Sequence, residues 1–348
     1  MFQDISLEEL RKLQNKKKLT VVDVRSPSEY ADASLPGSIN IPLFDDAERA
    51  EVGTLYKQTS IQAAKQRGLQ IVSAKLPDFI RQFEETEGDK AVFCWRGGMR
   101  SRTTATLLSL MDIHAYRLTG GYRAYRKWVT ETLESYDFRP RPYVIHGHTG
   151  TGKTTLLHRL HAGGYPVIDL EGLAGHRGSI FGQIGLKANN QKTFDSLLLE
   201  ELIRLEDAPY VLFEAESKRI GKVVMPPFLA EGKERATQLW IEMPVEARVE
   251  QILADYRPSE YKEDYLAAFR NIKSRIHVPI AAEIERSLIE ERYANAVVLL
   301  LEHYYDPKYD YTSGRYSPEE PVEKITFRVR NLEEAEAAVR GFLAEREG

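Results

Sequence analysis

The chain has 348 residues, of which 42% are hydrophobic and 29% are charged, with a net charge of −4. This length and composition predict about two globular domains, and the charge excludes a uniformly basic nucleic-acid-binding coat. No apolar run approaches the ~20 residues that span a bilayer, and the first residues lack the apolar core of a signal peptide. A single cysteine, Cys94, excludes a disulfide framework and a cysteine-cluster metal site. We therefore expect a cytoplasmic protein with no membrane partner.

The first part of the chain alternates predicted helices and strands. Residues 5–14 have the pattern of a short helix, and residues 19–24 are rich in β-branched side chains, which favours a strand. A turn at Pro36-Gly37 precedes a short strand at residues 39–41. Residues 91–93 form another buried strand, which ends at Cys94. This order is typical of an α/β domain.

The loop of residues 94–102 reads CWRGGMRSR and leads into a predicted helix at 103–110. Backbone N–H groups, the helix N-terminus and neighbouring arginines would stabilise a thiolate at Cys94. Such surroundings lower the pKa of a cysteine from ~8.5 to between ~3.5 and ~7.5. The alternative is a buried, inert cysteine, which would have apolar neighbours rather than positive ones. The sequence therefore predicts an anion-binding loop built around a thiol, with the arginines Arg96, Arg100 and Arg102.

The region before the linker resembles a rhodanese domain. This resemblance implies a three-layer α/β domain over residues 1–135 and a cysteine that carries sulfur as a persulfide. In this loop Arg100 lies six residues after Cys94, whereas the usual rhodanese loop has its arginine five residues after. The longer spacing is shared with rhodanese-like dual-specificity phosphatases, so the bound group is left open between sulfur and a tetrahedral oxyanion. The segments that carry the resemblance are DVRSPSEY (23–30), LPGSINIP (35–42), the Cys94 loop and LTGGY (118–122).

Residues 116–128 read YRLTGGYRAYRKW and interleave aromatic with basic side chains. Such interleaving suits an RNA surface, where arginines hold phosphates and rings stack on bases. An amphipathic helix that buries its rings and exposes its charges explains the pattern equally well. The sequence leaves these two interpretations open. The aromatic residues are Tyr116, Tyr122, Tyr125 and Trp128.

A proline-containing linker at 136–142 precedes the second predicted domain, residues 143–348. Its first residues, YVIHGHTGTGKTT (143–155), contain the complete motif G-x-x-x-x-G-K-[ST] between a strand and a helix. Backbone N–H groups of the loop and the helix N-terminus would bind phosphate or diphosphate. Lys153 would reach the terminal phosphate, and the Thr154 hydroxyl would bind Mg²⁺. The predicted phosphate-binding residues are Gly147, Gly150, Thr151, Gly152, Lys153, Thr154 and Thr155.

Two further segments follow predicted strands in this domain. Residues 165–170 predict a strand that leads into a glycine-rich stretch containing His176 and Arg177, at the sheet edge where α/β proteins bind ligands. The strand at 210–214 ends in Glu214, with Glu216 two residues later, and resembles a Walker B strand with glutamate in place of aspartate. A carboxylate there would hold Mg²⁺ or position a reacting group, but a solvated strand end explains it equally well.

The rest of the chain is predominantly helical. We expect a helix at 190–206, a strand at 239–243 and helices from 245 to about 305, interrupted at 255–258. A final helix is expected at 333–345. The sequence thus predicts an α/β P-loop NTPase-like domain with a helical C-terminal region.

A rhodanese domain joined to a P-loop domain, with the motifs CWRGGMRS and GHTGTGKT, resembles the tRNA 2-selenouridine synthase family. The segments DLEGLAGHRGSIFG (169–182) and FEAESKRIG (213–221) also resemble motifs of that family. The resemblance implies a transferase that replaces the sulfur of 2-thiouridine at the tRNA wobble position by selenium. It implies selenophosphate and geranyl diphosphate as substrates, an S-geranylated intermediate, and an enzyme that supplies selenophosphate as a partner.

The resemblance also implies roles for the predicted site residues. The P-loop would stabilise departing pyrophosphate, with Arg177 and Arg219 as further contacts, while the geranyl chain would need an apolar pocket among the C-terminal helices. Cys94 would accept selenium as a selenosulfide, with the loop arginines holding the phosphate. His176 or Glu216 would act as general acid or base. Thr154 and Glu214 would bind Mg²⁺, and ATP binding is left open.

Two other functions fit parts of the sequence. The first is an ATP-dependent rhodanese-type sulfurtransferase, or a C-x5-R phosphatase fused to an NTPase, whose ATP turnover would depend on Lys153. The second is a nucleotide-sensing protein with a degenerate rhodanese domain, in which Cys94 would be dispensable. Neither explains the segments at 169–182 and 213–221.

Overall fold

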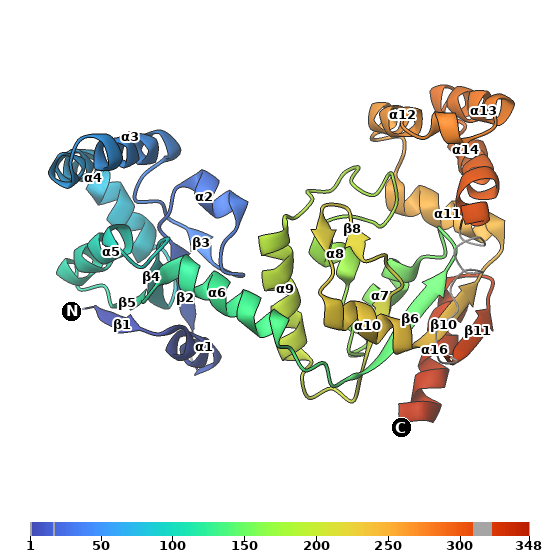
Figure 1. Cartoon of the computed structure of the whole chain (residues 1–348), viewed down its shortest axis with the longest axis horizontal. Coiled ribbons are helices and arrows are strands. Elements are labelled where there is room, and N and C mark those ends of the chain that lie inside the picture. The colour runs from blue at the N-terminus through green and yellow to red at the C-terminus, as the bar shows by residue number, and fades with distance from the viewer. Residues whose placement is uncertain (1, 17, 309–321, 348) are drawn as a thin grey trace. The chain divides into compact units, whose positions relative to one another are not determined.

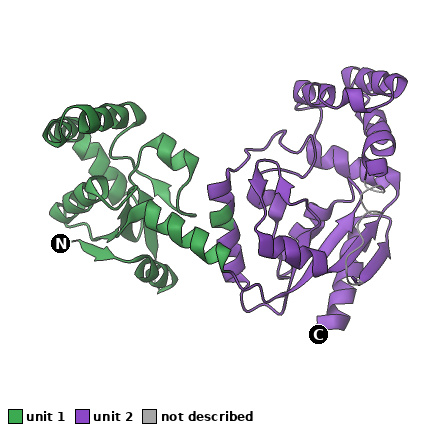
Figure 2. Cartoon of the chain, in the orientation of Figure 1, with its two compact units in different colours: residues 1–135, 195–197 green, residues 136–194, 198–348 purple. Residues whose placement is uncertain are grey.

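The computed structural model describes residues 2–16, 18–308 and 322–347. These residues form two compact units (Figure 2). The first unit contains the residues up to 135 together with 195–197, and the second contains 136–194 and the residues from 198 onward. Each unit has its own parallel sheet, so each is described by itself.

The first unit is built on a five-stranded sheet with the strand order β1-β5-β4-β2-β3 (Figure 1). All neighbouring strands in it run parallel. Parallel strands need long crossover connections, and helices supply most of them here. The strands are β1 (Gln3–Ile5), β2 (Leu19–Asp23), β3 (Ile39–Asn40), β4 (Asp89–Phe93) and β5 (Ala115–Leu118). The helices are α1 (Leu7–Lys16), α2 (Pro27–Asp32), α3 (Asp46–Gln58), α4 (Ile61–Glu84), α5 (Met99–Leu110) and α6 (Gly121–Glu134).

Both faces of this sheet are buried. Val22 and Val92 pack into one cluster with Phe83 of α4 and Leu108 of α5. The residues next to them in the strands point to the opposite face, and these are buried as well, with Ala91 only 1% exposed. Helices therefore cover both faces, and the predicted α/β fold class is confirmed.

The second unit contains a four-stranded parallel sheet with the order β11-β10-β6-β7 and a small antiparallel hairpin, β8-β9. The strands are β6 (Arg141–Gly147), β7 (Tyr210–Glu214), β8 (Arg219–Ile220), β9 (Val223–Val224), β10 (Thr237–Glu242) and β11 (Lys324–Arg328). One face of the sheet packs on α7 and α16, where Ile145 and Leu239 meet Leu156 and Val339. The phosphate-binding motif lies directly after β6, a central strand.

A helical region with a separate core follows this sheet. Phe269, Ile284 and Leu300 are buried in that core. The helices of the second unit are α7 (Lys153–Ala162), α8 (Leu170–Ala174), α9 (Gln191–Arg204), α10 (Pro227–Arg235), α11 (Val245–Tyr256), α12 (Lys262–Arg270), α13 (Val278–Ile289), α14 (Tyr293–Leu300) and α16 (Leu332–Glu347). A 3₁₀ turn, η1 (Lys273–Arg275), and a π-helical turn, η2 (Leu301–Tyr305), complete it. Within the described ranges, no helix has the length and apolar character needed to cross a membrane.

Two local predictions in the second unit need correction. Residues 165–170 do not form a regular strand: only Val167 pairs with β7, through a single parallel bridge to Leu212. Pro166 lacks an N–H group, and Asp169 instead accepts a hydrogen bond from the Gly172 N–H and caps α8. In addition, β6 starts at Arg141, inside the segment predicted to be linker, because a proline is tolerated near the beginning of a strand.

Candidate functional sites

The P-loop connects β6 to α7, and its shape depends on glycine. Gly150 and Gly152 have φ angles of +87° and +68°, which side chains rarely allow. A Cβ at Gly150 would lie 2.6 Å from Ile252, and one at Gly152 would lie 2.7 Å from Leu332. The loop is therefore packed closely against α11 and α16 as well as turned sharply.

Helix α7 begins at Lys153, so the N–H groups of its first turn point toward the loop. The Lys153 ammonium donates to the carbonyl oxygens of Gly147 and His148 at 2.9 and 3.3 Å. Thr151 is buried and donates to the same His148 carbonyl, which fixes the turn. These features form a positive cradle for a phosphate or diphosphate.

A cavity of about 1160 Å³ lies over this cradle. The predicted residues that line it include Gly150, Gly152, Lys153, Thr154 and Thr155, together with Arg177 and Glu216. Several other lining residues were not predicted from the sequence. The missed residues include His146, Glu171, Lys233, Trp240, Asp255, Tyr256 and Lys324.

The carboxylates beside the P-loop form a linked group. The Thr154 hydroxyl donates to Glu171 at 2.6 Å, and the Glu171 N–H donates to Glu214 at 2.7 Å. Burial, and then the negative charge of Glu216, raises the pKa of Glu171 to about 8. Burial raises the pKa of Glu214 well above its ordinary range. This group can hold or release a proton near neutral pH.

The structure places Glu214 beneath the cavity rather than in its lining. Its side chain is fully buried, and one carboxylate oxygen accepts the Glu171 N–H. The oxygens that reach the cavity next to the P-loop belong to Thr154 and Glu171. Within the described ranges, no group of three or more His, Cys, Asp or Glu side chains is arranged to hold a metal ion. The residues that fit Mg²⁺ beside a bound diphosphate are therefore Thr154 and Glu171.

Four other predicted residues of the second unit lie outside the cavity lining: Gly147, Thr151, His176 and Arg219. The His176 ring packs against Gly221, where a Cβ would lie 2.7 Å from the ring. Its Nδ1 is buried without a partner, and burial lowers the pKa of His176. Arg219 is exposed on β8. Arg177, by contrast, lines the cavity and lies 4.9 Å from the Tyr256 ring centre.

We expect Glu171→Gln to change how stability depends on pH. A raised pKa means that the native state binds more protons than the unfolded state between the ordinary value of ~4.3 and about 8. The free energy of unfolding should therefore fall as pH rises through that window, by at most about 1.4 kcal/mol per pH unit. Urea unfolding between pH 6.5 and 8 should show a flatter profile for Glu171→Gln. Equal slopes for the two proteins would contradict the raised pKa.

A buried arginine ties the P-loop to the helical region. Arg248 on α11 is 3% exposed, donates to the Thr149 carbonyl at 2.9 Å and forms two hydrogen bonds with Asp306 at 2.6 and 2.9 Å. An arginine pairs well with a carboxylate in this two-bond geometry. Arg248 therefore holds the loop and the end of η2 together.

Arg248→Ala should lower the free energy of unfolding by about 3 kcal/mol, because it leaves the Asp306 carboxylate largely buried without its partner. Arg235→Ala removes an exposed pair with Glu231 and should cost less than about 1 kcal/mol. Chemical denaturation of both variants measures the difference. Equal losses would show that the buried pair does not stabilise the loop.

A small apolar cavity of about 50 Å³ adjoins the P-loop cavity. Thr149, Ser179, Ile252, Tyr256 and Tyr305 line both cavities. The remaining walls come from the helical region and from the loop between α8 and α9, and they are almost entirely apolar. They include Phe181, Tyr265, Leu288, Val297, Leu300 and Leu301. The apolar wall of the small cavity thus lies next to the cavity above the P-loop.

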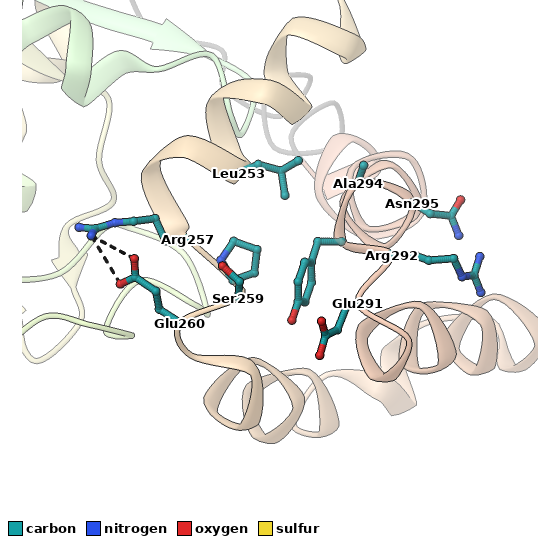
Figure 3. Close-up of a pocket in the computed structure, with 10 residues that line it drawn as sticks. Leu253, Arg257, Ser259, Glu260, Glu291, Arg292, Ala294 and Asn295 are labelled. Carbon is teal, nitrogen blue, oxygen red and sulfur yellow. Dashed lines mark hydrogen bonds and ion pairs between the residues drawn. The ribbon is translucent and has the colours of Figure 1, made fainter.

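A separate open groove of about 580 Å³ lies between the end of α11 and the beginning of α14 (Figure 3). Arg257 and Glu260 pair with each other on one side of it, as the dashed lines show. None of its lining residues lines the P-loop cavity. Of these two cavities, only the larger one adjoins the P-loop.

The Cys94 loop of the first unit connects β4 to α5. Cys94 is 3% exposed, and its sulfur lies 3.2 Å from the Ser101 hydroxyl oxygen. The Cys94 carbonyl accepts the Tyr122 N–H at 2.9 Å, and a Cβ at Gly121 would lie only 2.1 Å from that carbonyl oxygen. The loop is thus held against the beginning of α6, with its thiol at the N-terminal end of α5.

The loop arginines differ in their surroundings. Arg100 forms an ion pair with Glu29, which also lies near Arg49. Arg96 and Arg102 are exposed. An arriving anion would therefore compete with Glu29 for Arg100 but would meet solvated guanidinium groups at the other two positions.

Arg117 on β5 also supports the Cys94 loop. Its guanidinium donates to the Gly97 carbonyl at 3.1 Å and to both carboxylate oxygens of Asp4 at 2.6 Å. Asp4 lies on β1, which pairs with β5 in parallel register. The first strand of the chain therefore supports the Cys94 loop.

The aromatic and basic segment at 116–128 is an amphipathic element. Tyr122 and Tyr125 are 1% and 2% exposed, whereas Arg123 and Lys127 are exposed. Buried rings cannot stack on RNA bases, so these tyrosines belong to the core. The structure favours the second of the two interpretations for this segment.

The folds and sites define a P-loop phosphate-binding domain joined to a rhodanese-like domain with a cysteine loop. The Rhodanese-like domain model matches residues 6–128, and the model of the tRNA 2-selenouridine synthase AAA domain matches residues 140–332. The chain belongs to the tRNA 2-selenouridine synthase family.

Curated relatives with the name tRNA 2-selenouridine synthase extend over most of the chain. The Sulfurovum sp. (strain NBC37-1) protein is 32% identical over 92% of this chain and 94% of its own length. The protein of Pseudomonas syringae pv. tomato is 33% identical over 94% of both chains. The Nitrosomonas europaea protein is 36% identical over 68% of this chain and 63% of its own length.

Proposed function

We propose that this chain is a transferase that converts 2-thiouridine at the tRNA wobble position to 2-selenouridine. The observation that carries this proposal is the presence, in one family member, of both a cysteine loop at a helix N-terminus and a complete P-loop. The relatives carry the name of that activity. Selenophosphate, supplied by a separate enzyme, and geranyl diphosphate are the proposed co-substrates.

In the first proposed step, the P-loop domain transfers a geranyl group to the thiouridine sulfur. A bond forms between sulfur and the geranyl C1, and the bond from C1 to the diphosphate oxygen breaks. Lys153 and the loop N–H groups stabilise the departing pyrophosphate, and the base loses its N3 proton to a carboxylate. Glu216, which lines the cavity, fits that role, because Glu171 is assigned to Mg²⁺.

Mg²⁺ would supply positive charge that neutralises the diphosphate as it leaves. Thr154 and Glu171 would hold it at the edge of the cradle. The apolar wall formed by Phe181, Leu300 and their neighbours would receive the geranyl chain. That cavity is smaller than the chain, so the surrounding side chains must move apart on binding.

In the second proposed step, selenium replaces the alkylated sulfur. Alkylation makes the sulfur a better leaving group, since it departs as a geranyl thiol rather than as sulfide. The Cys94 loop binds selenophosphate, with Arg96 and Arg102 as the accessible contacts for its phosphate. The Cys94 thiolate attacks C2 of the base, and the bond from C2 to the sulfur of the leaving geranyl thiol breaks. The selenium of selenophosphate then displaces the thiolate from C2, and water cleaves the Se–P bond to release phosphate and leave 2-selenouridine. One base is modified twice, once by each site.

Nucleoside mass spectrometry tests this function. A tRNA carrying wobble 2-thiouridine is incubated with the protein and with geranyl diphosphate, selenophosphate, both or neither. The proposal predicts S-geranyl-2-thiouridine with the first reagent alone and 2-selenouridine only with both. Unchanged 2-thiouridine in every reaction would overturn the proposal and would favour an ATP-dependent sulfurtransferase or a phosphatase, which ATP and phosphate-ester hydrolysis assays would then detect.

A further inference from the structure

The P-loop cavity extends well beyond the phosphate cradle, over one face of the second sheet. Side chains alternate between the two faces of a strand. Because Ile145, Leu239 and Ile241 point into the core with α7 and α16, their neighbours His146 and Trp240 point to the opposite face. Both line the cavity. This face therefore presents polar and aromatic groups where an α/β sheet is usually covered by apolar packing.

Three adjacent strands place two stacked aromatic rings and a lysine on this face. His146 of β6 and Trp240 of β10 are register partners, and their rings stack with centres 4.9 Å apart and planes 16° apart. The Lys324 ammonium of β11 lies 3.8 Å from the centre of the Trp240 ring. We call these three residues the sheet platform. An indole of this kind, partly buried beside a cation, is a common surface for a planar ligand.

The electrostatics of the platform suit a base that is flanked by phosphates. Burial, and then the charge of Lys153, lowers the pKa of His146 to about 3, so its ring is neutral and stacks without a charge. Lys233 and Lys324 line the same part of the cavity. Lys324 is an exposed side chain at the start of its strand, so its ammonium can move from the indole to a phosphate while a base takes the ring.

We propose that the sheet platform binds the RNA nucleotide that is to be modified, with the base stacked on Trp240 and the adjoining phosphates near Lys324 and Lys233. This inference rests on the proposed function. A free nucleoside triphosphate fits less well, because its phosphates would occupy the P-loop and leave Lys324 and Lys233 without an anionic ligand. An RNA chain has a phosphate on each side of every base, and single-stranded RNA is bound by this combination of stacking and charge.

The test measures binding of a synthetic anticodon stem–loop containing 2-thiouridine to the full-length protein, and separately binding of inorganic pyrophosphate. Trp240→Ala should weaken RNA binding at least about tenfold, since stacking on one aromatic ring contributes that much. Trp240→Phe should restore most of the affinity. Lys324→Ala should weaken RNA binding and reduce its salt dependence, whereas the exposed control Lys222→Ala should not.

Pyrophosphate binding should stay within about twofold of wild type in all four variants, which also shows that the domain is folded. If Trp240→Ala binds the RNA as tightly as wild type, or loses RNA and pyrophosphate affinity equally, the platform is not the nucleotide site. If Trp240→Ala instead weakens ATP and leaves RNA unchanged, the platform binds a free nucleotide and the inference is overturned. Failure of the wild-type protein to bind or modify the RNA would overturn the proposed function as well.

Discussion

Cys94→Ser should abolish formation of 2-selenouridine while S-geranyl-2-thiouridine accumulates. The substitution replaces the sulfur by a smaller oxygen that can still hydrogen-bond with the Ser101 hydroxyl, so the loop should keep its shape. Oxygen at this position is not ionised at neutral pH and is a far weaker nucleophile than a thiolate. We expect a loss of about a thousandfold or more in the selenium step, in line with the loss of a catalytic nucleophile in other enzymes.

Two measurements make this result specific. Nucleoside mass spectrometry follows both modified nucleosides in one sample, so the geranylation step is an internal control for folding and RNA binding. Thermal unfolding of Cys94→Ser should match wild type closely. Wild-type rates of selenouridine formation in this variant would show that Cys94 does not carry the reaction and would favour a degenerate rhodanese-like domain.

Lys153→Ala should block the other step, with a loss of about a hundredfold to a thousandfold in geranyl transfer. Lys153 lies at the start of α7 and crosses the loop to the Gly147 carbonyl, so its charge is already placed beside the cradle. Removing it leaves the N–H groups of the loop to stabilise the leaving pyrophosphate alone. The exposed Lys222→Ala is the matched control, because it removes the same charge away from the cavity.

The decisive comparison supplies the intermediate. When given tRNA that already carries S-geranyl-2-thiouridine, Lys153→Ala should make 2-selenouridine at the wild-type rate, and Cys94→Ser should not. Loss of both reactions in Lys153→Ala would show that the P-loop also takes part in selenium transfer. ATP hydrolysis that depends on Lys153, without geranyl transfer, would support the alternative function of an ATP-dependent sulfurtransferase or of a phosphatase fused to an NTPase.

Local motifs of the P-loop and the Cys94 loop could be predicted because each is contiguous in sequence. A glycine pattern between a strand and a helix specifies its own backbone shape, and Gly150 and Gly152 indeed have positive φ angles. The α/β class of both domains also followed from the alternation of strands and helices. These features depend on interactions within short stretches of chain.

The walls of the P-loop cavity could not be predicted, because the fold brings them together from distant segments. In the sequence, Glu171 is only a residue that follows an expected strand. Its hydrogen bond with the Thr154 hydroxyl depends on the position of α8. Trp240 and Lys324 are 84 positions apart in the numbering, yet they meet because β10 and β11 are neighbours. The sequence contains two candidate carboxylates, Glu214 and Glu216. Only the structure shows that Glu214 is fully buried, whereas Glu216 lines the cavity.

Strand β1, at the start of the described chain, supports the loop that carries the Cys94 thiol. Arg117 connects Asp4 to the Gly97 carbonyl, so three residues of an edge strand help to fix a loop more than ninety positions away. Affinity tags or deletions that disturb residues 3–5 would therefore loosen the cysteine loop without altering any residue in it.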